Sequence, residues 1–155
     1  EHLQLVLTEV LGFKLIDAEG SFHLFEVGEG GNGASIIVEH REDLPAAQEG
    51  YGNVHHLALR VADEEALRFW IEKINRLEFP NSGFVERFYF KSEYFLAATH
   101  VLFELATDGP GFLEDETYEH AGEKLSLPPF LEPKRAGIEE FVRPFDTSDA
   151  NVQRN

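Results

Sequence analysis

The sequence predicts an α+β fold built from two related modules and a C-terminal extension. Several short segments alternate apolar and polar residues, as half-buried strands do. Two other segments place apolar residues three and four positions apart, as amphipathic helices do. The order of these segments then repeats with a period of about 60–65 residues, which indicates that one βαβββ unit occurs twice.

The first module, residues 1–50, lacks the opening strand of that unit. A one-sided helix is predicted over His2–Leu11, and Gly12 ends it. Three strands follow, at Lys14–Ala18, Phe22–Val27 and Ala34–His40. The glycine-rich segment at 28–33 has no helix after it, so it predicts a hairpin loop and not a phosphate cradle.

The second module, residues 51–108, contains the whole unit. Its opening strand is predicted at Val54–Val61, after a polar connector at 41–53. Asp63 is a suitable cap for the helix that follows, whose apolar stripe consists of Leu67, Trp70, Ile71, Ile74 and Leu77. Three further strands are predicted at Phe84–Phe90, Glu93–Phe95 and Val101–Ala106.

The remaining residues, 109–155, are rich in proline and charge. They predict an extension that wraps over the modules, with a short helix at Lys134–Val142 and a frayed tail at Asp146–Asn155.

The composition limits the partners of the protein. The 155 residues include 13 Lys and Arg against 29 Asp and Glu, a net charge of −16, which argues against nucleic acid and anionic membranes as partners. The chain has no cysteine, which excludes disulfides and thiolate chemistry. No apolar run approaches the roughly 20 residues that span a bilayer. We therefore expect a cytoplasmic protein. Because the chain has no methionine and begins inside a predicted helix, we also expect residues upstream of Glu1.

Strand alternation places two chemically useful side chains on one face of the second sheet. His55, Leu57 and Leu59 share the apolar face that the helix needs, so His56 points to the opposite face. The same alternation along Val101–Ala106 turns Glu104 away from the helix. An imidazole and a carboxylate are two of the three protein ligands of a facial triad for Fe²⁺, and the same pair suits Mn²⁺, Zn²⁺ or Ni²⁺. The alternative is a hydrogen-bonded strand histidine and a solvated glutamate.

Five segments carry a resemblance to a known family. The chain resembles the C-terminal half of ring-cleaving dioxygenases of the hydroquinone and chlorohydroquinone type. These belong to the vicinal oxygen chelate (glyoxalase, bleomycin-resistance and extradiol dioxygenase) superfamily. The segments are LTEVLGFKL at 7–15, GNVHHLALRVAD at 52–63, ERFYFKSEYF at 86–95, VLFELATDGPGFLEDE at 101–116 and LSLPPFLEPKRAGIE at 125–139.

The resemblance implies a fold and a set of site residues. The family has four βαβββ modules in about twice this length, with the metal inside open barrels. The resemblance implies His56 and Glu104 as ligands of Fe²⁺, Tyr94 and Arg87 near the substrate oxygens, and His55 as a neighbouring or acid–base group. The implied reaction inserts O₂ into a hydroquinone-like or catechol-like ring.

Two features depart from the family pattern. The third ligand in the family is a histidine on the opening strand of the first module, which this chain lacks, so we expect a fragment that is inactive alone. The acidic-Pro-Gly-Gly turn of the family is replaced by the segment 96–100. Of the other candidates, His100 lies about 13 Å along the strand from position 104, too far to bind the same ion. Glu39 corresponds to Glu104 in the first module but is not a ligand in the family. The remaining histidines are expected in structural (His23) or surface positions (His2, His40 and His120).

Two other functions stay open. A glyoxalase-like isomerase would use Zn²⁺ or Ni²⁺ without consuming oxygen. A non-catalytic module would bind a small molecule on the same fold.

The missing strand predicts an open edge on the first sheet, and such an edge pairs readily with another strand. We expect it to be covered by the absent N-terminal half, by a second chain in a homo-oligomer, or by residues 125–141.

Overall fold

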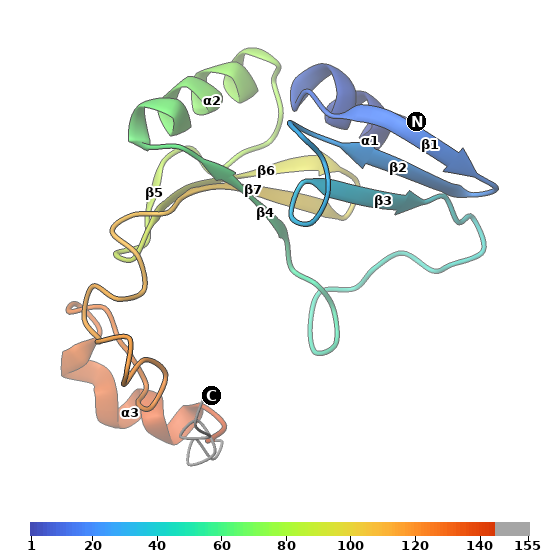
Figure 1. The fold of residues 1–155 in the computed structure, drawn as a ribbon. Helices are drawn as coiled ribbons and strands as arrows, with labels where there is room; N and C mark the ends of the chain where they lie inside the picture. Colours follow the sequence, from blue (N-terminus) through green and yellow to red (C-terminus); the bar gives the residue numbers. More distant parts are fainter. Residues whose placement is uncertain (145–155) are drawn as a thin grey trace. The chain divides into compact units, whose positions relative to one another are not determined.

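The computed structural model describes residues 1–144, which form two β-sheets and three α-helices (Figure 1). These residues fall into two compact units. Unit 1 consists of residues 1–58, 74–81 and 94–104, and unit 2 of residues 59–73, 82–93 and those from 105 onward. The units interleave along the chain, so the module boundaries at 50 and 108 stay a prediction. The tail predicted at Asp146–Asn155 lies outside the described residues.

The chain begins with the predicted helix. It consists of α1 (His2–Leu5) and one wider π-helical turn, η1 (Val6–Val10), in which the amide of Leu11 donates to the carbonyl of Val6 at 3.0 Å. Gly12 adopts a φ of 78°, a left-handed conformation that ends the helix. Val6 and Leu7 are buried, as the one-sided apolar pattern requires.

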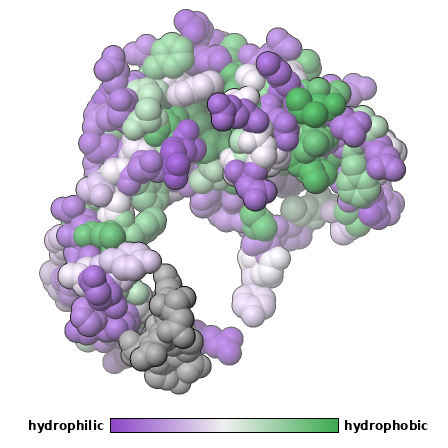
Figure 2. Space-filling view, viewed as in Figure 1, coloured by the Kyte–Doolittle hydropathy of each residue, from purple (hydrophilic) through white to green (hydrophobic). Residues whose placement is uncertain are grey.

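The first sheet contains three antiparallel strands in the order β1-β2-β3. They are β1 (Lys14–Glu19), β2 (Phe22–Glu26) and β3 (Ser35–Glu39), which confirms the three predicted strands. Within the described residues β3 pairs only with β2, so its outer edge is open and Ile37 is 69% exposed. Hydrophobic surface shows among hydrophilic atoms over the region of this sheet in Figure 2. What covers the edge stays a prediction.

The second sheet has the order β4-β7-β6-β5. Its strands are β4 (Leu57–Val61), β5 (Val85–Glu86), β6 (Lys91–Ala98) and β7 (Val101–Thr107), and α2 (Glu64–Arg76) follows β4. This confirms the predicted succession of one strand, one helix and three strands. The opening strand β4 pairs with the closing strand β7, which places residues more than 40 positions apart on neighbouring strands.

The opening strand is shorter than predicted. β4 begins at Leu57 and not at Val54, because the chain before it turns at Gly50 and Gly52, which have φ values of 138° and 89°. The alternation of faces therefore applies only from Leu57 onward. Leu57 is also 38% exposed, so the predicted burial of this face is wrong at its first residue, although it holds at Val61.

The predicted strand at Phe84–Phe90 is also wrong over most of its length. Only Val85–Glu86 pairs, with Ser92 and Lys91. The chain then reverses, because the amide of Arg87 donates to the carbonyl of Phe90 at 2.9 Å and Phe88 adopts a φ of 70°. The aromatic residues 88–90 have high strand propensity, but in the structure they form a turn. The next strand, β6, is longer than its prediction, Glu93–Phe95.

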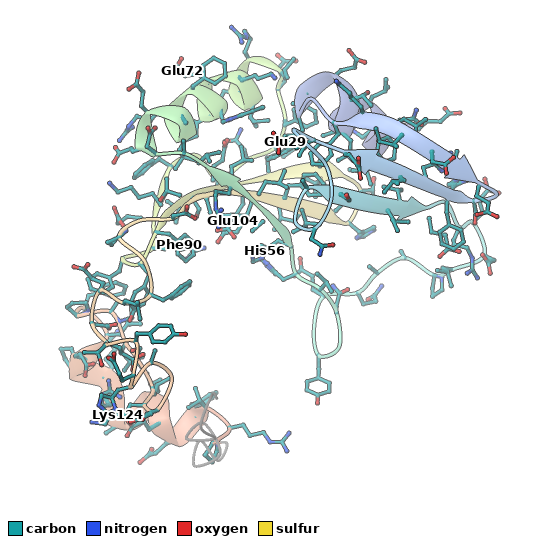
Figure 3. All side chains as sticks on the ribbon, viewed as in Figure 1. Glu29, His56, Glu72, Phe90, Glu104 and Lys124 are labelled. Atoms are coloured by element: carbon teal, nitrogen blue, oxygen red, sulfur yellow. The ribbon has the colours of Figure 1, made fainter. Side chains whose placement is uncertain are left out.

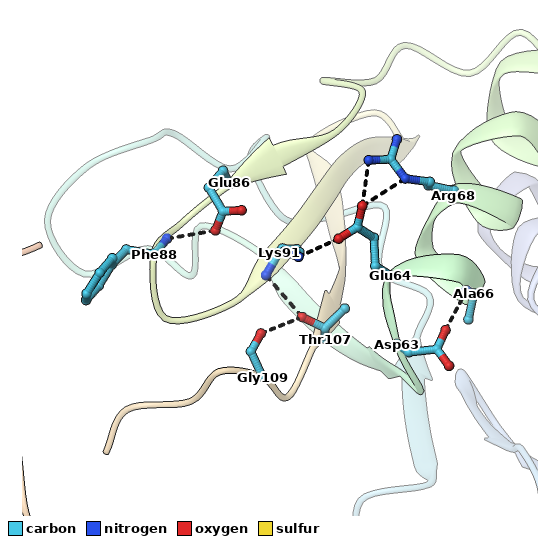
Figure 4. A network of polar contacts seen from close by, with 9 residues as sticks. All are labelled: Asp63, Glu64, Ala66, Arg68, Glu86, Phe88, Lys91, Thr107 and Gly109. Atoms are coloured by element: carbon cyan, nitrogen blue, oxygen red, sulfur yellow. Dashed lines mark hydrogen bonds and ion pairs between the residues drawn. The ribbon is translucent and has the colours of Figure 1, made fainter. Parts of the chain in front are cut away.

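Polar contacts attach the start of α2 to the strands of unit 2 (Figure 4). The carboxylate of Asp63 accepts from the amide of Ala66 at 2.8 Å, which confirms the predicted cap. Glu64 binds both Lys91 and Arg68. The hydrogen bond from Lys91, and to a smaller extent that from Arg68, lowers the pKa of the Glu64 carboxyl group. The amide of Lys91 donates to the hydroxyl of Thr107 at 3.1 Å.

Aromatic rings form the centre of unit 1. Phe95 on β6 lies edge-on to Phe79 and to Phe103 on β7, with centroids 5.8 Å apart in both pairs. Phe95 is fully buried and Phe103 is nearly so. These contacts fix β6 against β7 on the face opposite the candidate site.

The extension carries the predicted short helix. It begins with a 3₁₀ turn, η2 (Glu132–Lys134), and continues as α3 (Arg135–Phe141). Within unit 2 the hydroxyl of Tyr89 donates to Asp115 at 2.7 Å, and the ring of Tyr89 stacks on Phe112. No helix in residues 1–144 is long and apolar enough to cross a membrane.

Candidate metal-binding site

His56 and Glu104 lie in direct contact in unit 1 (Figure 3). The Nε2 atom of His56 is 2.8 Å from the Oε2 atom of Glu104. Because β4 and β7 are neighbours in the sheet, the residue before β4 meets the middle of β7. The predicted convergence of these two side chains is confirmed, and the alternative of a solvated Glu104 is wrong.

The side chain of Glu104 is buried, and one of its two carboxylate oxygens makes no hydrogen bond in the described residues. The residue is 3% exposed, and its Oε1 atom has no hydrogen-bond partner in the described residues. A buried charged oxygen without a partner costs several kcal/mol unless a cation compensates it. This carboxylate therefore has the properties expected of a metal ligand.

The spacing of the two donor atoms also suits a shared ion. Two ligands about 2.1 Å from one ion, at about a right angle, lie about 3.0 Å apart. The observed 2.8 Å is close to this value, so both atoms could bind one cation with little movement. Imidazole nitrogen and carboxylate oxygen are the donors of non-haem Fe²⁺ sites, and they also accept Mn²⁺, Zn²⁺ and Ni²⁺. The residues present thus fit a divalent ion.

The structure does not assemble a complete ligand set. In residues 1–144 no three or more histidine, aspartate or glutamate residues form a group that could hold a metal. Glu39, the corresponding residue of the first module, binds Arg41 at 3.3 Å. His40 and His120 are exposed near Glu42 and Glu123 respectively, which agrees with their predicted surface positions. His23 lies on β2 opposite Val38, as a strand residue.

His55 lies beside His56 and not on the opposite face. The two Nδ1 atoms are 2.8 Å apart and the rings are perpendicular. The predicted alternation is wrong here because both residues precede β4, where the backbone has not entered the regular strand. The predicted proximity of His55 to the site is confirmed, and its chemical role stays a prediction.

Tyr94 approaches the other side of the His56 ring. It lies on β6, and its ring centroid is 5.4 Å from that of His56 in an edge-on arrangement. β6 pairs with β7, so Tyr94 and Glu104 come from neighbouring strands. Sequence reasoning placed Tyr94 near the substrate only through the resemblance, and the structure places it against the candidate ligand.

Arg87 belongs to unit 2 and lies in the turn after β5, not on a strand. Its amide donates to Phe90, and its side chain is exposed. The role of Arg87 in binding substrate stays a prediction. His100 adopts a φ of 61° in the turn before β7, so it is not on the strand where the pattern placed it.

A pocket of about 350 Å³ opens beside the two histidines in unit 1. Apolar side chains of β3 and of the β4 and β7 segments form most of its wall, and His55, His56 and His100 contribute polar groups. The volume is at the lower end of the range of small-molecule sites. The pocket is also bordered by the open edge strand β3, through Ile36, Ile37, Val38 and Glu39.

Sequence reasoning missed one unusual residue close to this site along the chain. Glu93, the residue before Tyr94, is fully buried in unit 2, and neither of its carboxylate oxygens has a partner in the described residues. Burial raises the pKa of this carboxyl group from 4.5 to about 7. The signal was available, because alternation along β6 puts Glu93 on the same face as Phe95, which is apolar and buried.

The fold and the paired donors define the class of protein. The arrangement of strands and helix is that of the vicinal oxygen chelate fold. Solved structures support it. A glyoxalase, bleomycin resistance protein and dioxygenase domain from Frankia sp. EAN1pec superposes with a TM-score of 0.57 at 17% identity over 68% of this chain and 85% of that one. The structure of lactoylglutathione lyase from Agrobacterium tumefaciens superposes with a TM-score of 0.52 at 14% identity, over 68% of this chain and 83% of that chain.

Sequence comparison narrows the class. The chain is 46% identical over 144 residues to a Bacillus subtilis (strain 168) protein named "Putative ring-cleaving dioxygenase MhqA", covering 90% of this chain and 46% of that protein. It is 35% identical over 119 residues to a Sphingobium indicum protein named "Chlorohydroquinone/hydroquinone 1,2-dioxygenase". The match covers 74% of this chain and 36% of that protein. A crystal structure described as that of a "putative dioxygenase" from Bacillus subtilis subsp. subtilis str. 168 superposes with a TM-score of 0.81 at 35% identity, over 94% of this chain and 46% of that chain.

The chain thus has the vicinal oxygen chelate fold and is similar in sequence to proteins named as ring-cleaving dioxygenases. No protein-family model matches it. The chain spans about half the length of the curated relatives it matches. The activity of those longer proteins comes to this chain only as a proposal.

Proposed function

We propose that this chain forms the metal-binding half of a ring-cleaving dioxygenase that acts on a hydroquinone-like or catechol-like ring. The contact between His56 Nε2 and Glu104 Oε2 carries the proposal, together with the unpartnered Oε1 of the same buried carboxylate. His56 and Glu104 would hold a divalent ion, and Fe²⁺ is the ion that we propose. When bound, Fe²⁺ supplies open positions for the substrate and O₂ and transfers electrons between them.

The residues near His56 and Glu104 would have different roles in the reaction. Tyr94, whose ring borders that of His56, would accept or donate a proton at a ring hydroxyl of the substrate. Apolar walls of the pocket, including Leu102 and Val54, would bind the aromatic ring and exclude water.

The third protein ligand would come from outside residues 1–144. The outer edge of β3 is open and borders the pocket beside His56. A strand added there would follow the order of the second sheet, in which the opening strand pairs with the closing one. We propose that residues of the absent half, or of a second chain, form that strand and contribute a histidine.

Metal binding tests the proposal directly. The protein is titrated with Mn²⁺ as an air-stable probe, and His56→Ala and Glu104→Gln are compared with the exposed control Glu72→Gln. We expect each ligand variant to weaken Mn²⁺ binding at least tenfold, and the control to bind as the wild type does. Equal affinity in all four proteins would show that these residues are not ligands.

Oxygen uptake tests the reaction. The Fe²⁺-loaded protein is supplied with hydroquinone, with and without the N-terminal half of a longer relative, and O₂ consumption is recorded. Stoichiometric O₂ consumption that depends on His56 supports a dioxygenase. Turnover of a thiol adduct without O₂ consumption would favour the isomerase, and the absence of both activities in a metal-loaded complex would favour a binding module.

A further inference from the structure

A second, smaller cavity lies beside the pocket of the candidate site. It is formed by residues from 47–55 and 96–102, all of which belong to unit 1, and its volume is about 90 Å³. Val54, His100 and Leu102 line both cavities, so the two are neighbours that share part of a wall. The smaller cavity, which we call the side pocket, has room for about three non-hydrogen atoms. That is the size of a ring substituent and not of a ring.

Polar side chains line the side pocket without binding one another. Glu49, Asn53 and His100 all border it, and none of these three side chains has a hydrogen bond or an ion pair within residues 1–144. The carboxylate of Glu49 is an acceptor and the imidazole of His100 has an N–H donor, so both are available to a third group between them. A few polar groups around one cavity with apolar neighbours are typical of small-molecule sites, where they fix the orientation of the ligand.

The backbone of His100 is a second sign that its side chain has a function. The residue has a φ of 61°, a left-handed conformation that glycine adopts without steric cost. The turn that this segment replaces in the family contains two glycines, and the segment 96–100 contains none. An unfavourable conformation at a residue that borders two cavities points to a role for its side chain in binding.

We propose that the side pocket binds a small, uncharged, polar substituent of the aromatic substrate, and that Glu49 and His100 determine this specificity. His100 donates a hydrogen bond to the oxygen of the substituent, and Glu49 accepts its hydrogen. A hydroxymethyl group has the required size and supplies both functions. The negative charge of Glu49 disfavours a carboxylate in the same place. This inference rests on the proposed function, since it takes the larger pocket as the site of the aromatic ring.

A pair of ligands of similar size tests the hydrogen bonds. 2-(Hydroxymethyl)hydroquinone and 2-ethylhydroquinone differ in that only the first has a hydroxyl in the substituent. Each is titrated under argon into the ¹⁵N-labelled chain, and the dissociation constant is taken from the amide shifts. No metal ion is added, so the result does not depend on the metal site. We expect the wild type to bind the hydroxymethyl compound about 3-fold to 10-fold more tightly, as one additional hydrogen bond predicts.

Three variants assign the preference to His100. His100→Ala should reduce it to less than about twofold, because the donor is lost. His100→Asn should restore part of it, because asparagine tolerates the left-handed backbone and supplies an N–H donor. Thr99→Ala changes an exposed residue of the same turn that borders neither cavity, and it should keep the preference of the wild type. The amide spectrum of each variant shows whether the fold is retained.

A charged ligand tests the role of Glu49. 2,5-Dihydroxybenzoate carries a carboxylate at the ring position that bears the substituent in the other two compounds. At low ionic strength we expect Glu49→Gln to bind it at least about threefold more tightly than the wild type does, because the repulsion is removed. Glu72→Gln removes the same charge from an exposed position on α2 and should bind it as the wild type does.

The outcomes separate this inference from the proposed metal site. Equal affinity of the wild type for the hydroxymethyl and ethyl compounds would overturn the specificity of the side pocket, and so would a preference that persists in His100→Ala. Failure of all three compounds to bind would also overturn it, while Mn²⁺ binding that depends on His56 would leave the metal site standing. A preference that depends on His100, in a chain that binds no Mn²⁺, would support the side pocket and refute the metal site.

Discussion

Glu93 carries a carboxyl group that is fully buried and has no hydrogen-bond partner in the described residues. Its pKa rises from 4.5 to about 7 because burial disfavours the charged form. The group is protonated in the folded protein at a pH where it is ionised in the unfolded chain. Folding therefore binds a proton, and the stability of the protein falls as the pH rises from about 4.5 to about 7.

The size of the effect follows from the pKa. Each pKa unit corresponds to about 1.4 kcal/mol, so the rise to about 7 costs about 3 kcal/mol of unfolding free energy above pH 7. Below pH 4.5 the penalty disappears, since both states are then protonated.

Glu93→Gln removes the charge and keeps the shape of the side chain. We expect the variant to be more stable than the wild type by about 2–3 kcal/mol at pH 8, and by less than about 0.5 kcal/mol at pH 4. Urea unfolding between pH 4 and pH 8, followed by the fluorescence of the single tryptophan, Trp70, measures both curves. Other titrating groups affect the two proteins equally and cancel in the difference.

Glu72→Gln is the matched control, because Glu72 is exposed on α2. Its stability should follow that of the wild type at every pH. Parallel curves for Glu93→Gln and the wild type across pH 4–8 would show that the carboxyl group of Glu93 is not held neutral by burial, and the reasoning from its burial would fail.

Three further predictions about the fold are tested by urea unfolding. His100→Gly should stabilise the protein by up to about 1 kcal/mol, because His100 has a φ of 61° that suits glycine, while Thr99→Gly, which lacks a positive φ, should not stabilise it. Asp63→Ala should cost about 1 kcal/mol through loss of the cap on the Ala66 amide, and Asp63→Ser should retain most of the stability. Leu67→Ala should cost about 2–4 kcal/mol, because the side chain is fully buried; a loss below 1 kcal/mol would contradict its place in the core.

Much of the fold could be predicted from the sequence because strand and helix periodicities are local properties. The three strands of the first sheet and the helix from Glu64 follow directly from their spacing. The errors occur where the backbone leaves regular structure. Phe88 has strong strand propensity but lies in a turn, and Gly50 and Gly52 delay the start of β4. Propensity does not reveal such turns, because they are set by pairing between strands.

The site was predicted only in part for a related reason. Alternation correctly selected His56 and Glu104, since each lies near the strand face that carries no helix. It misplaced His55, which lies two residues before β4 begins, outside the regular strand. It did not single out Glu93, although the same alternation puts that carboxyl group among apolar neighbours.

The sequence by itself determined most of the strands and helices and the pair of residues worth testing, because these depend on neighbours a few positions apart. Only the tertiary structure decided that β4 pairs with β7, and so that an imidazole and a carboxylate 48 positions apart lie at 2.8 Å. It also decided that Glu104 is buried with one oxygen unsatisfied. Pairing between distant strands and the exclusion of water are collective properties of the folded chain, and no local pattern contains them.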